Sequence, residues 1–315
     1  MGDVPTPALE QLPALIAPSL GPASLKQRPW GGRRLAKLRA DSIPADAPPD
    51  AIWGESWEFS TLPGSESFAL GQELSALLGG PLPFLAKLID TECALSIQVH
   101  PEDDPEAASL GKEEAWVILD ATPGAAVLVG VREHVDAPEL RRRAEAAWRD
   151  PRSHGPNLVE ALERIEVARG DVILVPGRTV HAIQGGILLA EIQQPTDCTY
   201  RVFDYGSERE IHPEASLATI DVEARPLTWI RHLADGDREL SGRHVHLSIR
   251  QGPAQLSIEH PGVPALLVCV DGSAGLEVGV QSESLKAGDL RLWTHGRLET
   301  SLPPGGQLVI GYLLT

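Results

Sequence analysis

The residues of this sequence that could do chemistry begin with Gln98 and His100, in the segment ALSIQVHPE, and His181, in GDVILVPGRTVHAI. Between them, the segment GKEEAWVIL carries two neighbouring carboxylates, Glu113 and Glu114. Neutral imidazoles, a carboxylate and an amide oxygen are ligands that suit zinc, with one coordination position left open for water or a substrate. These residue types predict a divalent-metal site in which either Glu113 or Glu114 is the acidic ligand.

The alternation of a β-strand explains how Gln98 and His100 could act together. Residues i and i+2 of a strand point to the same side, so both head groups lie opposite Ile97 and Val99. Pro101 then ends the strand, because proline lacks a backbone donor and fixes the local dihedral angle. His181 follows a Gly-Asp turn, an apolar run and a Pro-Gly turn that sets the direction of the next strand.

These histidines could also have a purely structural role. A single histidine in a strand is more often a packed or surface residue than a metal ligand, and Gln-x-His alone does not change that. The combination of QVHP, an intervening glutamate and PGRTVHA makes the metal interpretation about as strong as the structural one. On pattern alone, both stay open.

The elements that must position these residues are mostly short strands. Apolar runs bounded by Gly and polar turns predict strands of a barrel or sandwich. Before the C-terminal region, strands are expected near 53–62, 83–90, 94–100, 113–120, 125–131, 171–176, 187–194 and 200–205. Charged, alanine-rich text at about 134–166, with Asp136 as N-cap and Pro138 in the first turn, predicts a helical insertion. The fold class is therefore predicted to be mainly β.

The order of these elements predicts two modules after an N-terminal lead. We expect a lead at 1–25, a larger β-module at 26–226 and a smaller, barrel-like β-module at 227–315. In the smaller module, LKAGDLRLWTHG echoes the segment around His181 but lacks its proline, and no Gln-x-His-Pro strand precedes it. This module is expected to hold no metal, with His295 structural and the pair His244 and His246 without a third ligand.

Charge and cysteine spacing narrow the classes of partner. A formal net charge of −17 would repel nucleic acid and acidic membrane surfaces, whereas a small anion could bind where local Lys and Arg outweigh that field. Cys93, Cys198 and Cys269 are widely spaced and show no CxxC pair, which predicts neither disulfides nor a zinc knuckle. No signal peptide or membrane span is expected. We expect a cytoplasmic monomer or homodimer that acts on a small molecule.

Several longer segments resemble a known family. The segments RPWGGRRL, GESWEFS, LPFLAKLID, LSIQVHP, GKEEAWVIL, GDVILVPGRTVHAI and LLAEIQQPTDCTYRVFDYG resemble type I mannose-6-phosphate isomerases in their short bacterial form, members of the cupin superfamily. The resemblance covers roughly residues 25–215, in the same order and with similar spacing, and is looser beyond them. It implies a cupin-type β-barrel or jelly roll, and an isomerase that interconverts mannose 6-phosphate and fructose 6-phosphate.

The resemblance also implies a set of metal ligands. In this family one zinc ion per chain is held by the Gln and His of the QxHP strand, a later Glu and the His of the second motif. These positions correspond to Gln98, His100, Glu114 and His181, because the family's acidic ligand lies two residues after the lysine of the Gly-Lys pair. Glu113 is then expected to be a solvated neighbour.

The remaining site residues also come from the resemblance. Isomerisation moves a proton from C2 to C1 through an enediol, whose negative charge a divalent cation stabilises. Family positions imply Arg201, Glu191 and Lys112 as catalytic residues, and Lys87, Ser96 and Arg201 as residues that bind the sugar phosphate. A buried, unpaired ammonium is costly, so Lys87 requires either a bound phosphate or an acidic partner.

Three points qualify this expectation. Arg178 replaces the small residue usual in the second motif's turn, and could add positive charge at the pocket mouth. A non-enzymatic sugar-phosphate-binding cupin would keep the phosphate residues but lose ligands or Arg201, and none of these is lost. A cupin oxygenase would more usually place a histidine where Gln98 stands.

Overall fold

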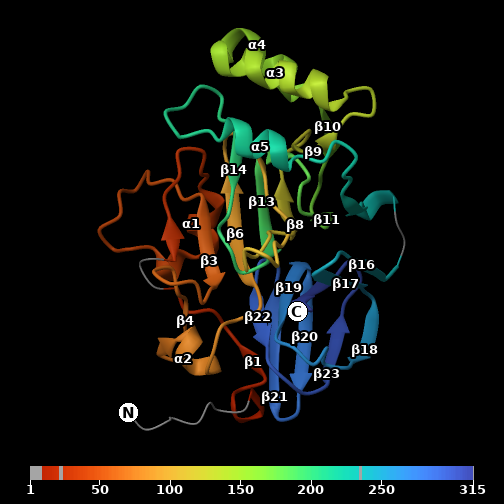
Figure 1. Ribbon diagram of the computed structural model, residues 1–315. Helices are drawn as coiled ribbons and strands as arrows, with labels where there is room; N and C mark the ends of the chain where they lie inside the picture. The colour runs from red at the N-terminus through yellow and green to blue at the C-terminus, as the bar shows by residue number, and fades with distance from the viewer. Residues whose placement is uncertain (1–8, 21–23, 234–235, 315) are drawn as a thin grey trace.

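The computed structural model describes residues 9–20, 24–233 and 236–314 and shows a stack of β-sheets with the helices of residues 137–159 and 213–219 at one end (Figure 1). The predicted lead at 1–25 lies partly outside the described residues. A seven-stranded sheet contains β2 (Leu25–Lys26), β3 (Glu55–Phe59), β6 (Leu85–Thr91), β8 (Glu114–Ala121), β11 (Val172–Val175), β13 (Ile187–Gln193) and β15 (Leu227–Trp229). A five-stranded sheet contains β7 (Ile97–Val99), β9 (Ala126–Val131), β10 (Leu162–Glu166), β12 (His181–Ile183) and β14 (Tyr200–Phe203).

Two further sheets form the C-terminal part of the stack. The six-stranded sheet contains β1 (Leu15–Ile16), β16 (Arg238–Ser241), β17 (Val245–Gln251), β19 (Ala265–Asp271), β22 (Leu290–Trp293) and β24 (Gln307–Leu313). The four-stranded sheet contains β18 (Ala254–Ile258), β20 (Ser273–Val278), β21 (Gln281–Lys286) and β23 (Leu298–Leu302). A separate hairpin pairs β4 (Phe68–Ala69) with β5 (Gln72–Glu73).

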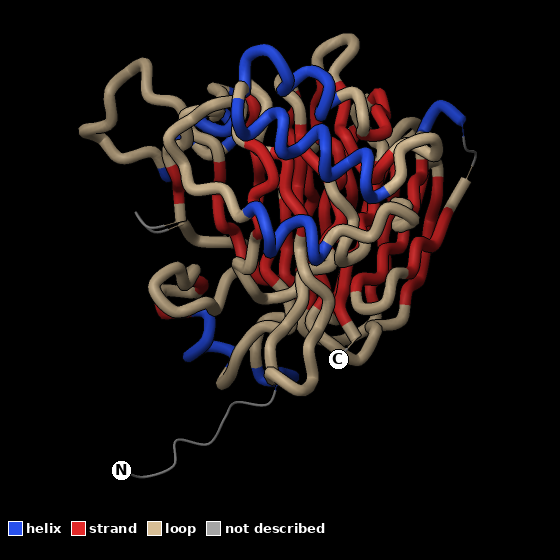
Figure 2. The backbone as a smooth tube through the Cα atoms, turned by 45° about the horizontal axis from the view of Figure 1, so that its top comes forward, coloured by secondary structure: helices blue, strands red, loops and turns tan. Residues whose placement is uncertain are grey.

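Helices are short and mostly lie outside the sheets. They are α1 (Arg34–Leu38), α2 (Leu74–Leu78), α3 (Ala137–Arg149), α4 (Pro151–Val159) and α5 (Pro213–Thr219), with 3-10 turns η1 (Leu9–Gln11), η2 (Ala40–Ser42) and η3 (Arg231–Leu233). Figure 2 shows helices lying across the strands at this end of the molecule. Within the described residues, no helix has both the length and the apolar character needed to cross a bilayer.

The predicted helical insertion is present but shorter than expected. Asp136 caps α3 by accepting a hydrogen bond from the backbone N–H of Glu139, and Pro138 lies in its first turn, as predicted. Residues 162–166, however, form β10 and not a helix, because they pair with the otherwise free edge of β9. The ladder on that edge outweighs the helical preference of the local sequence.

The predicted fold class, mainly β and cupin-like, is confirmed, with one difference in closure. Every sheet formed by the described residues has two edge strands, so the strands make open, stacked sheets and no closed barrel. One core, which includes Trp116, Ile118 and Val127, lies between the seven-stranded and five-stranded sheets. A second core joins the seven-stranded sheet to the six-stranded sheet, where Ile192 packs against Gly311. Both faces of the seven-stranded sheet are therefore covered.

Candidate active site and metal centre

Alternation along the seven-stranded sheet decides which side chains face the five-stranded sheet. In β8, Ala115 belongs to the core shared with the C-terminal sheets, so Glu114 and Trp116 point the opposite way, into the space between the seven-stranded and five-stranded sheets. The same alternation sends Lys87 of β6 and Glu191 of β13 to that inner face. Glu191 lies opposite Lys87 in one ladder and opposite Trp116 in the other.

The five-stranded sheet supplies the facing wall. Ile97 packs toward the helices, so Gln98 and, just beyond the strand, His100 point inward. Gln98 is the direct ladder partner of His181 on one side and of Arg201 on the other. Three of the predicted ligands and catalytic residues therefore lie side by side on neighbouring strands: His181, Gln98 and Arg201.

His100, Glu114 and His181 converge on one point from the two sheets. Their ligand atoms all lie within 4.8 Å of one another, and all three side chains are buried. Nε2 of His100 is 3.4 Å from one oxygen of Glu114, and Nε2 of His181 is 3.4 Å from the other. Two imidazoles and a carboxylate around a common centre are a donor set that a divalent cation such as zinc prefers.

The second nitrogen of each imidazole is held by the backbone. Nδ1 of His100 lies 3.0 Å from the carbonyl oxygen of Cys198, and Nδ1 of His181 lies 2.8 Å from that of Thr179. Since a carbonyl can only accept, each ring carries its proton on Nδ1 and turns the Nε2 lone pair toward Glu114. Nε2 of His181 and the Glu114 oxygen that faces it are buried without a hydrogen-bond partner among the described residues, whereas Lys112 contacts the other Glu114 oxygen. These orphaned acceptors fit a bound cation.

The ionisation of these groups agrees with that fit. Burial, followed by the positive charge of Lys112, lowers the pKa of His100 to about 3, and burial also lowers the pKa of His181. Burial alone would raise the pKa of Glu114, but Lys112 and the two histidines outweigh it and lower that pKa well below its usual value. At neutral pH the set is therefore two neutral imidazoles and a carboxylate.

Lys112 reaches the same point from just before β8. Its ammonium lies 2.9 Å from one oxygen of Glu114 and 3.1 Å from Nε2 of His100. Burial opposes its charge, but the carboxylates of Glu114 and Glu191 outweigh burial and raise the pKa of Lys112. Lys112 is thus a permanent positive charge beside the cluster.

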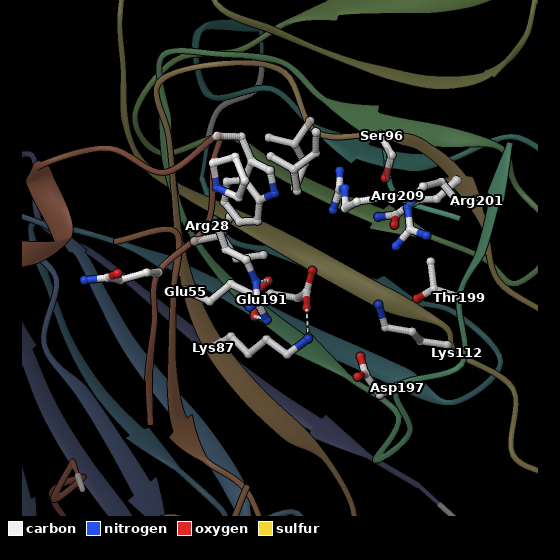
Figure 3. A pocket seen from close by; sticks show the side chains of 17 residues that line it. Arg28, Glu55, Lys87, Ser96, Lys112, Glu191, Asp197, Thr199, Arg201 and Arg209 are labelled. Carbon is white, nitrogen blue, oxygen red and sulfur yellow. Dashed lines mark hydrogen bonds and ion pairs between the residues drawn. The ribbon is translucent and has the colours of Figure 1, made fainter. Parts of the chain in front are cut away.

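A cavity of about 490 Å³ opens beside this cluster (Figure 3). Its wall includes Lys87, Ser96, Gln98, Lys112, Glu191 and Arg201, which are all of the predicted site residues outside the three buried ligands. Five of the lining side chains are Lys or Arg and three are Asp or Glu, although the whole chain has a formal charge of −17. The cavity is therefore a local positive region that suits an anionic ligand.

Lys87 and Glu191 form a buried pair on one wall. The ammonium of Lys87 lies 3.2 Å from Glu191, donates a 2.7 Å hydrogen bond to Gln193 and stands over the ring of Trp57. Glu191 is thus the acidic partner that the buried ammonium of Lys87 requires. Trp116 donates to the other oxygen of Glu191. Burial, followed by the charge of Glu114, raises the pKa of Glu191.

Arg201 and Arg209 form a second basic region of the wall, and Figure 3 shows them beside Ser96 and Thr199. Arg209 makes a two-point ion pair with Asp204, and Arg201 donates to the carbonyl of Glu210. Nε of Arg201 is a buried donor without a hydrogen-bond partner among the described residues. Burial, and then the charge of Arg209, lowers the pKa of Arg201.

Sequence reasoning missed several of these lining residues. Arg209, Asp197, Arg28 and Glu55 all face the cavity, and the last two pair with each other. Arg209 lies after β14 in the irregular segment GSERE, where no periodicity indicates a direction. Only its charge, close in sequence to Arg201, could have suggested it.

Two expectations about neighbouring residues were wrong. Glu113 is not solvated: its side chain is buried and accepts backbone hydrogen bonds from Arg243, His244 and Val245. A chain turn from the C-terminal sheets replaces water around this carboxylate. Arg178 does not line the cavity, because its guanidinium donates to the carbonyl of Thr219 near α5.

Comparisons with known proteins identify relatives of this chain. No known family profile matches the sequence. Mannose-6-phosphate isomerase of Streptococcus mutans is 31% identical over 298 residues, which cover 85% of this chain and 89% of that protein. Mannose-6-phosphate isomerase ManA of Bacillus subtilis is 29% identical over 321 residues, which cover 91% of this chain and 96% of that protein.

Solved structures share the fold. The crystal structure of mannose 6-phosphate isomerase from Bacillus subtilis matches with a TM-score of 0.71 and 24% identity, over 95% of this chain and 100% of that one. A zinc-bound mannose 6-phosphate isomerase matches with a TM-score of 0.70 and 17% identity, over 96% of this chain and 100% of that one. The resemblance seen in the sequence segments is confirmed by the full-length relatives, and the chain belongs to the mannose-6-phosphate isomerase family.

Proposed function

We propose that this chain is a zinc-dependent aldose–ketose isomerase that interconverts mannose 6-phosphate and fructose 6-phosphate. The observation that carries the proposal is the convergence of His100, Glu114 and His181 beside a positively lined cavity. Relatives named for this activity cover most of the chain, and a zinc-bound enzyme of that name shares its fold. Such a substrate is a small anion, which the lining charges suit.

The residues that would hold zinc are His100, Glu114 and His181, with Gln98 as the fourth ligand. Gln98 lies on the same inward face, at the cavity wall and directly opposite His181 in the ladder. When bound, zinc supplies a positive charge that stabilises the negative charge developing on O1 and O2 of the sugar. One ion per chain is expected.

Different cavity residues have different roles in the proton transfer. In the aldose-to-ketose direction, a base removes the proton from C2 and returns it to C1, while a proton passes from O2 to O1. We assign the role of base to Glu191. Its pKa is raised toward neutral pH, and contacts with Lys87 and Trp116 hold its carboxylate in place. Lys112 stays protonated, so we assign it the stabilisation of charge on the sugar oxygens.

The phosphate group fits the end of the cavity that contains Arg201 and Arg209. Two guanidinium groups that repel each other gain from an anion between them, and Nε of Arg201 has no hydrogen-bond partner among the described residues. Ser96 adds a hydroxyl on the same wall. Lys87, which the family pattern implied for the phosphate, is engaged by Glu191 and Gln193. We therefore assign it to the support of Glu191.

The test of this function is a coupled assay of fructose 6-phosphate formation from mannose 6-phosphate. Activity should disappear on chelation and return with zinc, and His181→Ala should lose both zinc and activity. His246→Ala is the matched control, because His246 stacks on Tyr312 in the C-terminal sheets and should keep both. Activity indifferent to chelation would remove the zinc mechanism. A folded protein that binds the sugar phosphate without converting it would be a binding protein instead.

The location and the assembly of the protein stay predictions. We expect a cytoplasmic monomer or homodimer that binds neither nucleic acid nor membranes, and the division at residue 226 is likewise a proposal. Size-exclusion chromatography with light scattering would measure the assembly.

A further inference from the structure

A single turn of the C-terminal sheets grips the segment that carries the proposed metal ligands. The turn at 242–245 joins β16 to β17, and three of its backbone N–H groups donate to the carboxylate of Glu113 at 3.1, 2.9 and 2.7 Å. Glu113 is only 4% exposed and directly precedes Glu114. A buried carboxylate with three backbone donors is a well-satisfied anion, so this contact is strong.

The turn is shaped for this contact. A Cβ added at Gly242 would lie 2.2 Å from an oxygen of Glu113, so only glycine permits the approach. His244, in the same turn, reaches further along the segment: its Nε2 lies 3.1 Å from Asp103. One turn therefore holds both ends of the loop that runs from His100 to Glu114.

The loop itself is closed by a connected set of hydrogen bonds. Asp103 accepts from the backbone of Gly111 at 2.7 Å and from the side chain of Gln194 at 2.9 Å. Gln194 in turn accepts from the backbone N–H of Glu113 at 2.9 Å. The backbone N–H of Lys112 donates to the carbonyl of Pro101 at 3.0 Å. A shift of the turn would reach Lys112 and Glu114 through these bonds.

We propose that the 242–245 turn is a positioning device for the metal site, with Glu113 and His244 as its contact residues. Neither residue touches the substrate; the turn fixes where the carboxylate of Glu114 and the ammonium of Lys112 stand. The C-terminal sheets thereby contribute to a site that lies between the other two sheets. The inference rests on the proposed role of Glu114 as a metal ligand.

The experiment compares zinc affinity, by chelator competition, in wild type, Glu113→Gln and Gly242→Ala. Residues that orient ligands typically change metal affinity 10–100-fold, so both variants should weaken zinc binding by about 10-fold or more. At saturating zinc, kcat should fall while KM for mannose 6-phosphate stays within about twofold, since the turn does not line the cavity. In the metal-free protein, amides of residues 101–113 should exchange hydrogen faster in both variants.

Asp271→Asn is the matched control. It alters a carboxylate whose 2.7 Å ion pair with Arg231 ties the C-terminal sheets to the chain elsewhere. It should leave zinc affinity and exchange at 101–113 unchanged. Should either turn variant fail to fold, His244→Ala replaces it, because that side chain is partly exposed and its loss should still speed exchange at 101–113.

Wild-type zinc affinity and unchanged exchange in the folded turn variants would overturn the inference, as would an equal loss in Asp271→Asn. A wild-type protein that binds no zinc would instead overturn the proposed function. In that case the hydrogen-exchange comparison alone would test whether the turn positions residues 101–113.

Discussion

Arg201 and Arg209 face the same cavity although both carry a positive charge. Each is restrained by its own acceptor, Arg209 by the carboxylate of Asp204 and Arg201 by the carbonyl of Glu210. The lowered pKa of Arg201 reflects burial first and then this neighbouring charge. Two like charges held in place by separate acceptors at one end of the cavity form a preorganised anion site.

Replacing Arg209 by alanine should mainly weaken substrate binding. A hydrogen bond to a charged group contributes about 1.5–3 kcal/mol, so KM for mannose 6-phosphate should rise by roughly 10-fold or more, with zinc content unchanged. Steady-state kinetics and metal analysis measure the two quantities. Arg141→Ala, on the surface of α3, is the control and should leave KM as it is. An unchanged KM in Arg209→Ala would place the phosphate elsewhere.

Replacing Arg201 by alanine should lower turnover as well as binding. Arg201 pairs directly with Gln98, a proposed ligand, on the neighbouring strand. Arg209 lies in the loop after β14. We expect kcat to fall by more than about 10-fold while zinc remains bound, because a phosphate held less firmly no longer aligns C1 and C2 with Glu191. Loss of zinc in this variant would mean that Arg201 supports the metal site.

At the level of residues, some assignments could be predicted from the sequence and others could not. His100, Glu114 and His181 lie in regular strands or at their ends, so alternation and the family motif sufficed to bring them together. The role of Glu113 could not be predicted, because its partners lie about 130 residues away in the chain. Contacts at such separation leave no local pattern.

The packing of α4 on β14 connects the helical insertion to the strand of Arg201. Gly155 is buried in α4, and a Cβ there would lie 2.7 Å from the ring of Phe203. The indole of Trp148 in α3 donates to the carbonyl of Val202 in the same strand. The two helices are thus fixed on the outer face of the five-stranded sheet.

Gly155→Leu should therefore destabilise the protein. Overpacking in a closed contact typically costs about 1–3 kcal/mol, although leucine favours helix more than glycine does. Urea denaturation should show a lower midpoint for Gly155→Leu, while His154→Leu, exposed in the same helix, should remain near wild type. Equal midpoints for both variants would contradict the close contact with Phe203.

The sequence predicted the central strands better than the boundaries of the insertion. β6, β8 and β13 are rich in apolar residues and buried along most of their length, because both faces of the seven-stranded sheet are covered. The segment 162–166 carries no such run, since β10 is an edge strand with mostly exposed side chains. Whether this segment forms a strand depends on its pairing with β9, which lies too far away in the sequence for a local pattern to indicate it.

The whole molecule shares cores across the boundary predicted at residue 226. β1, from the N-terminal lead, pairs with β22, and β15, just beyond the boundary, pairs with β11. Apolar residues of the seven-stranded and six-stranded sheets form one cluster. The stability of the metal site is therefore coupled to the stability of the entire stack.

This coupling predicts how the metal-free protein responds to acid. His100 has a pKa of about 3 when folded and about 6.5 when exposed, so below pH 6.5 the unfolded chain gains a proton that the folded protein excludes. The free energy of unfolding should fall as pH is lowered from about 6.5 toward 3, by up to about 1.4 kcal/mol per pH unit for this group. Urea midpoints at pH 7 and pH 5 measure it.

The lowered pKa of Glu114 acts in the same direction at more acidic pH, because the unfolded chain binds a proton there that the folded protein excludes. His100→Gln should show a shallower dependence between pH 7 and pH 5. A midpoint that is constant or rises on acidification in the wild type would contradict the burial of a neutral imidazole.

The carbonyl oxygen of Cys198, and not its thiol, orients the ring of His100. Every amino acid offers that same backbone oxygen, so the thiol can be exchanged for serine without disturbing the imidazole. Cys269 is buried, which would leave the exposed Cys93, beside Trp30 at a neighbouring surface hollow, as the one readily labelled thiol of the described residues. A fluorophore attached there could report substrate entry in real time.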